Sequence, residues 1–241
     1  MGDSGAAARS PWRRRIPRIL GGAVALGVAG AILAWWLTPS VSDAPRRVQR
    51  LAAADHAGPL LTRLPDRLSA AVLAVEDHRF YHHPGLDGTA LLRAGSAAVA
   101  GHDSGAATIE VQLAKWLYTG RRSGRLDQAE QAVLAVKLDV AYTKSQVLLM
   151  YLNTVYFGHG YYGATAASLG YFQLEPDQLS WAQAALLAGL LVAPDALDPV
   201  EHPRAAAQRR DYALSRLVAV GTITPADRQA AAGPDLQLAG S

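Results

Sequence analysis

The chain has 241 residues, of which 50% are apolar and 18% are charged, so it can bury a sizeable core and is not a disordered protein. It contains no cysteine, which excludes a disulfide framework, catalysis by a thiolate and zinc–thiolate sites. The formal net charge is +3, but residues 1–18 carry five arginines against one aspartate, so the remaining residues sum to −1 and nucleic acid is not an expected partner.

A long apolar run follows the basic N-terminus. Residues 19–37 contain no charged side chain and end in Trp35, Trp36 and a leucine. A helix of this length reaches about 28 Å, which nearly matches the hydrocarbon core of a bilayer. We therefore predict a transmembrane helix over 19–37, a cytoplasmic tail over 1–18 and an extracytoplasmic domain beyond it. A cleaved signal peptide is the alternative, although its apolar core is usually shorter and residues 41–44 form a poor cleavage site.

The exported part divides by composition. Two prolines and mixed polar residues predict a linker over residues 38–50. Apolar residues recur at helical spacing through residues 51–232, which predicts one mostly α-helical domain, and residues 233–241 form a tail.

Three helix starts have clear signals. Thr143 and Ser180 each stand three residues before a glutamine, in the form of a capping box that opens an apolar periodic run. Thr224 precedes a proline, which is well tolerated in the first turn of a helix. Helices are therefore predicted to begin after all three residues.

Two acidic residues follow an apolar helical run directly. Residues 69–75 are apolar apart from one serine, and Glu76 and Asp77 come next. Apolar surroundings raise the pKa of a carboxyl group toward neutrality, as a general acid or base working near pH 7 requires. The alternative is structural, with one of the two carboxylates capping a turn or pairing with Arg79.

Three histidines close to these acids are not expected to bind a metal ion. His78 and His82 are four residues apart, and His83 adjoins them. However, no glutamate lies between the first two in the pattern of a metalloprotease, and the Pro-Gly pair at 84–85 ends any helix.

Five segments resemble the motifs of a known family. Residues 76–87 read Glu-Asp-His-Arg-Phe-Tyr-His-His-Pro-Gly-Leu-Asp and resemble the first motif of the peptidoglycan glycosyltransferases, glycosyltransferase family 51. Residues 105–115 are similar to the second motif, and segments within residues 142–172 to the third and fourth. Residues 179–190 are similar to the fifth. The likeness covers about 68–199 in the order of the family.

The resemblance implies an all-α, lysozyme-like domain outside a bacterial cytoplasmic membrane that polymerises lipid II into glycan strands and releases undecaprenyl diphosphate. It makes Glu76 the general base that takes the proton of the acceptor's 4-hydroxyl. It gives Asp77, Phe80 and His83 the role of shaping the pocket. The further residues that it implies for substrate binding are Thr108, Gln112, Lys115, Arg122, Lys144 and Asn153, with the two lysines proposed for the diphosphate.

The expected partners are lipid II, the growing glycan strand, the membrane, and a separate transpeptidase or a protein of the division or elongation machinery. No cofactor follows from the residues, and a divalent cation near the diphosphate stays open.

The second acidic residue of the family is displaced in this chain. Its position falls on Gln131, whereas Glu130 lies one residue earlier. One residue turns a helix by about 100°, so Glu130 substitutes only if a bulge re-aims it. An arginine expected nearby falls on Ser123, with Arg122 beside it. The other departures from the second and fifth motifs replace glycine, proline or polar residues, at Ala106, Ala107, Glu110, Val111, Leu191 and Val192.

Three functions are compatible with this pattern. The first is a divergent but working polymerase that uses Glu76 with Glu130 or nearby arginines. The second is a catalytically weak homologue that binds lipid II or a partner in cell-wall synthesis. The third is a glycan-cleaving hydrolase on a similar scaffold. The complete first motif favours the polymerase, because a binding scaffold has no need to bury Glu76.

Overall fold

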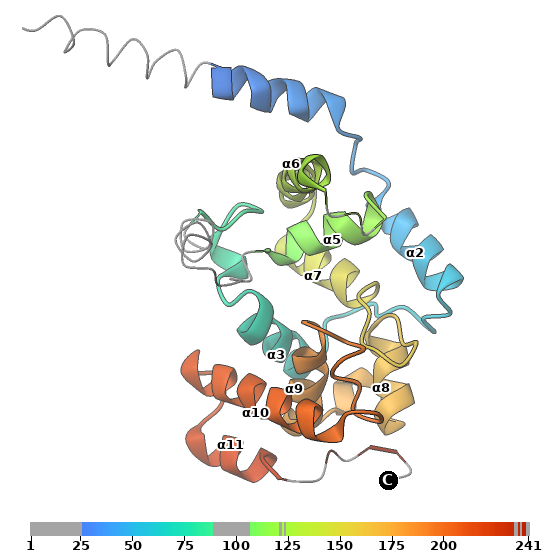
Figure 1. The fold of residues 1–241 in the computed structure, drawn as a ribbon, viewed down its shortest axis with the longest axis vertical. Coiled ribbons are helices and arrows are strands. Elements are labelled where there is room, and N and C mark those ends of the chain that lie inside the picture. The colour runs from blue at the N-terminus through green and yellow to red at the C-terminus, as the bar shows by residue number, and fades with distance from the viewer. Residues whose placement is uncertain are drawn as a thin grey trace, which may run out of the picture. The chain divides into compact units, whose positions relative to one another are not determined.

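The computed structural model describes residues 26–88, 107–120, 122, 124–233, 236 and 238–239 (Figure 1). Within these residues every regular element is a helix, and the one isolated β-bridge joins Tyr156 to Tyr162. The prediction of a mostly helical domain is therefore confirmed.

The chain divides into two units, residues 1–39 and 40–241. In the first unit, residues 26–37 are helical. Among the described residues, none of the helices has both the length and the apolar character needed to cross a membrane. Residues 19–25 of the predicted span lie outside the described residues, so the transmembrane helix stays a prediction.

The second unit holds the helices that build the domain. In chain order they are α2 (Ala44–Ala54), α3 (Asp66–Glu76), the 3-10 turn η1 (Phe80–His82), α5 (Ile109–Leu117), α6 (Arg125–Ala141), α7 (Lys144–Leu152), α8 (Ala164–Phe172), the 3-10 turn η2 (Pro176–Gln178), α9 (Trp181–Leu190), α10 (Pro203–Ala219) and α11 (Pro225–Ala231).

The three predicted helix starts are confirmed. Thr143, Ser180 and Thr224 each accept a hydrogen bond from the backbone N–H three residues further on. In all three capping boxes the side chain at that third position also bonds the backbone N–H of the cap, so two otherwise unpaired donors are satisfied.

The predicted linker over residues 38–50 is wrong in its second half, because α2 begins at Ala44. Pro45 stands in the first turn of this helix, where its missing N–H costs nothing, and it therefore starts the helix instead of marking a linker. Ala44 and Val48 are buried, and the guanidinium of Arg47 donates to the carbonyl oxygen of Leu117 at 3.1 Å. The helix is thus fastened to the rest of the domain.

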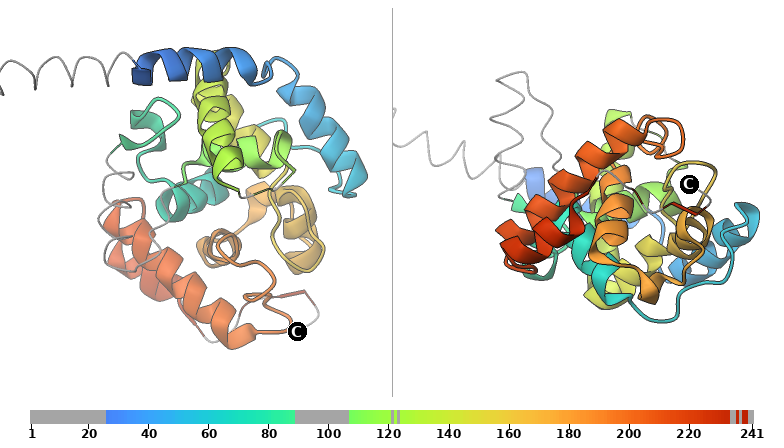
Figure 2. Two further views of the ribbon diagram at one scale, coloured as in Figure 1. Left: turned by 45° about the horizontal axis from the view of Figure 1, so that its top comes forward. Right: turned by 90° about the horizontal axis from the view of Figure 1, so that it is seen from below.

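The core has two packed groups of helices. The helix α9 packs against α3 and α10, while α5 packs against α6 and α7 (Figures 1 and 2). All residues from Ala182 to Leu190 are buried. Gly189 lets α10 approach closely, because a Cβ atom there would lie 3.1 Å from the carbonyl oxygen of Arg209.

Candidate active site

A cavity of about 830 Å³ is lined by residues from both helix groups. The end of α3, the helices α5 and α6, and the segment after α9 all contribute to its wall. The polar residues that line it are Glu76, Asp87, Gln112, Lys115, Arg122, Gln128 and Gln131. Four of the residues predicted for the site, namely Glu76, Gln112, Lys115 and Arg122, are therefore brought together.

Glu76 is the last residue of α3 and is held by a chain of two hydrogen bonds. The amide nitrogen of Gln112 donates to the Oε2 atom of Glu76 at 2.8 Å. The hydroxyl of Tyr151, on α7, donates to the Oε1 atom of Gln112 at 2.9 Å. Because an ionised carboxylate can only accept hydrogen bonds, the amide nitrogen of Gln112 must face Glu76, and the amide oxygen then accepts from Tyr151. Tyr151 was not among the predicted site residues, since its spacing indicates only a core position.

Burial is the main reason why the pKa of Glu76 is raised. The negative charge of Asp77 also raises it, whereas the hydrogen bond from Gln112 and the positive charge of Arg209 lower it. The carboxyl group thus lies in surroundings that favour proton uptake, with one hydrogen bond keeping the charged form accessible.

Asp77, Phe80 and His83 form a buried support behind Glu76. The carboxylate of Asp77 lies 2.9 Å from the Nε2 atom of His83 and accepts a long hydrogen bond, at 3.4 Å, from the backbone N–H of Ile109. The ring of Phe80 is 1% exposed and meets the ring of His83 edge to face. None of the three lines the cavity.

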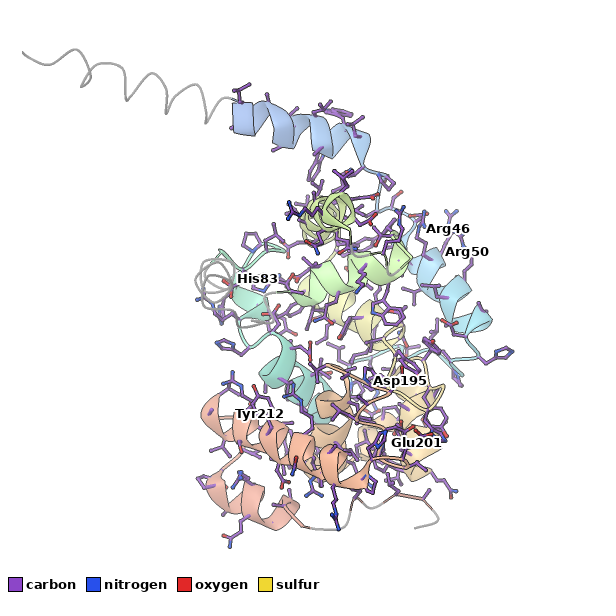
Figure 3. All side chains as sticks on the ribbon, viewed as in Figure 1. Arg46, Arg50, His83, Asp195, Glu201 and Tyr212 are labelled. Carbon is purple, nitrogen blue, oxygen red and sulfur yellow. The ribbon has the colours of Figure 1, made fainter. Side chains whose placement is uncertain are left out.

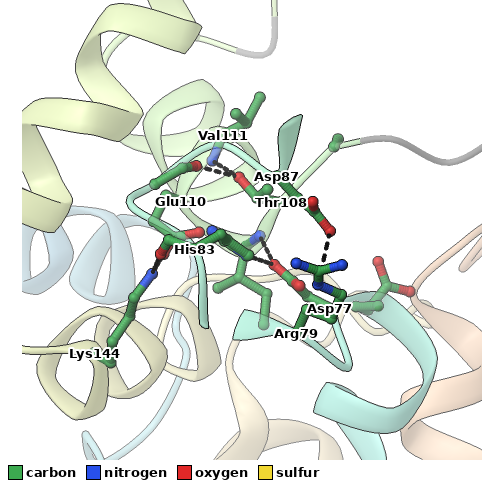
Figure 4. Close-up of polar contacts among 12 residues, drawn as sticks. Asp77, Arg79, His83, Asp87, Thr108, Glu110, Val111 and Lys144 are labelled. Carbon is green, nitrogen blue, oxygen red and sulfur yellow. Dashed lines mark hydrogen bonds and ion pairs between the residues drawn. The ribbon is translucent and has the colours of Figure 1, made fainter. Parts of the chain in front are cut away.

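Thr108 caps α5 and joins this support to it. Its hydroxyl donates to the carbonyl oxygen of Gly85 at 2.7 Å and accepts from the backbone N–H of Val111 (Figure 4). The cap therefore ties the start of α5 to the turn that carries His83. Thr108 is placed to position Gln112, which lies one turn further along the same helix.

Lys144 lies in an ion-pair network rather than in the wall of the cavity. Its ammonium group contacts the carboxylate of Glu110 (Figure 4), that of Asp139 at 2.7 Å, and the carbonyl oxygen of His83 at 2.7 Å. It also lies 4.7 Å from the centre of the Phe80 ring. Glu110 is fully buried; burial raises its pKa, whereas the hydrogen bond from Lys144 lowers it. The sequence-based role of Lys144 at a diphosphate has no support in this placement.

Asn153 also lies away from the cavity. Its side chain accepts from the backbone N–H of Leu61 at 2.8 Å and donates to the carbonyl oxygen of the same residue at 3.1 Å. It thereby pins an extended segment to the end of α7.

Two cations line the cavity within the described part of the chain, Lys115 and Arg122. Lys115 belongs to the last turn of α5, and the Nε atom of Arg122 donates to the carbonyl oxygen of Thr119 at 2.9 Å. An anionic group of a ligand would meet these two side chains.

Gln131 and not Glu130 lines the cavity. The amide nitrogen of Gln131 donates to the hydroxyl of Thr119 at 2.8 Å and to the carbonyl oxygen of Arg122 at 2.9 Å. The carboxylate of Glu130 lies 3.8 Å from the guanidinium of Arg122. The neutral residue therefore takes the position where the resemblance expects the second carboxylate.

Among the described residues, one group of side chains has the composition of a metal site. Asp77, His83 and Glu110 are buried and bring donor atoms within 4.8 Å of one another. His83 is already paired with Asp77, and Glu110 with Lys144, whose ammonium group would repel a divalent cation. The group fits a charge network better than a metal centre.

Comparison with known proteins gives one consistent family. The family model described as Transglycosylase matches residues 46–218. A Cupriavidus necator protein named as a transglycosylase is 38% identical over 177 residues, which cover 73% of this chain and 77% of that protein.

Longer proteins match as well. Penicillin-binding protein 1A of Aquifex aeolicus is 36% identical over 74% of this chain, and that of Escherichia coli is 37% identical over 68%. The matched region spans 25% and 20% of those two proteins. The crystal structure of penicillin-binding protein 1A from Haemophilus influenzae is similar over 75% of this chain and 18% of that one, with 20% identity and a TM-score of 0.44.

Proposed function

Because the chain belongs to the transglycosylase family, we propose that it is a peptidoglycan glycosyltransferase that polymerises lipid II into glycan strands. The observation that carries the proposal is the position of Glu76, a carboxyl group with a raised pKa at the wall of a large cavity. The matched region spans only a fifth to a quarter of the length of these two penicillin-binding proteins. The proposal therefore concerns transglycosylation alone.

In the proposed reaction, Glu76 is the general base. Its carboxylate accepts the proton of the acceptor's 4-hydroxyl while that oxygen forms a bond to C1 of the donor sugar. The bond from C1 to the diphosphate oxygen breaks, the diphosphate takes the electron pair, and the configuration at C1 inverts. Partial burial suits this role, because a base works best when its pKa lies near the working pH.

Lys115 and Arg122 are the proposed partners of the leaving diphosphate. Negative charge develops on that group as the bond to C1 breaks, and fixed cations stabilise it in the transition state. A planar guanidinium also suits paired phosphate oxygens. In this proposal Lys144 supports the site and does not contact the substrate.

A lipid-linked substrate needs a catalyst that is held at the same membrane. We propose that residues 19–37 provide the anchor, with the N-terminus inside and the catalytic domain outside the cytoplasmic membrane. Cross-linking of the product would then need a separate transpeptidase as a partner.

A catalytically weak homologue that binds lipid II is the second candidate function. One observation favours it, which is the neutral Gln131 in the cavity wall while Glu130 lies beside Arg122. Loss of a second carboxylate removes one group that could hold a cation beside the diphosphate.

The nature of the product separates the candidates. The full chain in detergent is incubated in parallel with purified lipid II and with finished cell-wall sacculi. We expect glycan polymer from lipid II and no fragments from sacculi. Fragments would indicate a hydrolase, and bound but unchanged lipid II would indicate the weak homologue; either result would overturn the proposal.

A further inference from the structure

Among the described residues that line the cavity, two are aromatic, Trp116 and Tyr156. Both are partly buried, so that part of each ring packs in the protein and part is accessible. Tyr162 joins them. Its ring centre lies 6.2 Å from that of Trp116 at an interplanar angle of 79°, and 4.6 Å from that of Tyr156 at 31°.

Tyr156 is fixed at both ends. A β-bridge to Tyr162 holds its backbone, and its hydroxyl donates to the carboxylate of Asp195 at 2.7 Å. Asp195 lies on the segment that follows α9 (Figure 3). A side chain that is already ordered loses little conformational entropy when a ligand binds to it, so the ring is prepared as a contact surface.

The position of Trp116 on α5 relates it to the proposed base. Trp116 follows Gln112 by four residues, so the two side chains share one face of the helix, about 6 Å apart along its axis. Gln112 contacts Glu76 directly. Trp116 and Glu76 also line the same cavity.

The chemistry of this wall suits a sugar ring. A pyranose presents polar edges and a face of C–H groups, and these C–H groups are attracted to the negative face of an aromatic ring. Gln112 stands on the same helix as Trp116, and Gln128 lines the cavity from α6; their amides offer partners to hydroxyl and acetamide groups.

We propose that Trp116 and Tyr156 form a carbohydrate subsite next to Glu76, on which an N-acetylglucosamine-type pyranose stacks. The inference rests on the proposed function and assigns a binding site to the sugar unit that neighbours the reacting one. Neither residue takes part in the chemistry; both position the substrate.

The test uses a probe that needs no turnover. A β-1,4-linked tetramer of N-acetylglucosamine is titrated into the full chain in detergent, and binding is followed by saturation transfer to the C–H protons of the sugar. We expect transfer to these protons in the wild type. Trp116→Leu and Tyr156→Leu should each weaken the affinity about tenfold, as loss of an aromatic contact implies.

Matched variants keep the rings. Trp116→Phe and Tyr156→Phe should stay within about threefold of the wild type, and circular dichroism verifies the fold of all four variants. If Trp116→Leu fails to fold, Tyr156→Leu still tests the subsite. The subsite would be overturned if the wild type transferred no saturation to the sugar protons. It would also be overturned if the Leu and Phe variants bound the tetramer with equal affinity.

A short prenyl diphosphate is titrated as a competitor. If it displaces the tetramer in the wild type and depends on Trp116 in the same way, the wall binds the lipid and the inference fails. The two proposals fail separately, because tetramer binding through Trp116 without polymerisation would refute only the proposed function. Polymerisation with an unchanged tetramer affinity in the Leu variants would refute only the subsite.

Discussion

Replacing Gln112 with leucine should raise the pKa of Glu76 and move the pH dependence of the reaction. The amide of Gln112 stabilises the charged form of Glu76 through a hydrogen bond of 2.8 Å, and this bond lowers a pKa that burial raises. Leucine keeps the apolar part of the side chain and removes the donor. The charged form then loses stability relative to the protonated form.

The magnitude follows from the hydrogen bond. A bond to a charged group contributes about 1.5 to 3 kcal/mol, and we take the lower end because Glu76 is partly exposed. Since 1.36 kcal/mol corresponds to one pKa unit, the pKa of Glu76 should rise by about one unit. A general base works in its deprotonated form, so the acid limb of activity should move to higher pH by the same amount.

The assay is kcat/KM for polymerisation of labelled lipid II across pH, which reports on the base in the free enzyme. Tyr151→Phe is the matched control. It leaves the amide of Gln112 in place but removes the hydroxyl that orients it, so a smaller shift in the same direction is expected. An acid limb that stays in place in Gln112→Leu, or moves to lower pH, would refute the reasoning.

Three further outcomes are expected. The folded-state pKa of Glu76 is raised above an unfolded value of about 4.3, so the folded state binds more protons above that pH and its stability falls as the pH rises from the unfolded to the folded pKa. Glu76→Gln should therefore increase the melting temperature at pH 7 but not at pH 4. An equal effect at both pH values would contradict this. Lys144→Met should lower the free energy of unfolding, measured in urea, by about 3 kcal/mol because it leaves Glu110 buried and unpaired. The double variant with Glu110→Gln should recover most of this loss, and no recovery would argue against the ion pair. Glu130→Gln should leave the polymerisation rate within twofold, since Gln131 and not Glu130 lines the cavity, and a loss of tenfold or more would assign Glu130 to the reaction.

Local signals in the sequence predicted those parts of the fold that depend on local chemistry. The capping boxes at Thr143 and Ser180 place two helix starts correctly, because the hydrogen bonds that make them join residues three positions apart. The helix α2 was missed, since Pro45 and its charged neighbours look like a linker unless the buried face of Ala44 and Val48 is known.

The candidate site was likewise predictable in part. The family resemblance assigned eleven residues to the site, and four of them, Glu76, Gln112, Lys115 and Arg122, line one cavity. It could not predict that Lys144 turns toward Glu110, because residues distant in the chain form that network.

Tyr151 was missed for a related reason. Its hydroxyl reaches an amide 39 residues away, whereas its helical spacing fits an ordinary core residue. Motif order thus identifies the residue set, and packing decides which members line the cavity.

The most direct measurement of the central claim compares Glu76→Gln with the wild type in polymerisation of lipid II and in binding of lipid II. Glutamine has nearly the same shape but cannot take up the proton of the acceptor hydroxyl. We predict that the rate falls at least a thousandfold while the affinity for lipid II stays within a few fold, in keeping with the contribution of a general base. A folded Glu76→Gln variant that polymerises lipid II at the wild-type rate would contradict the account.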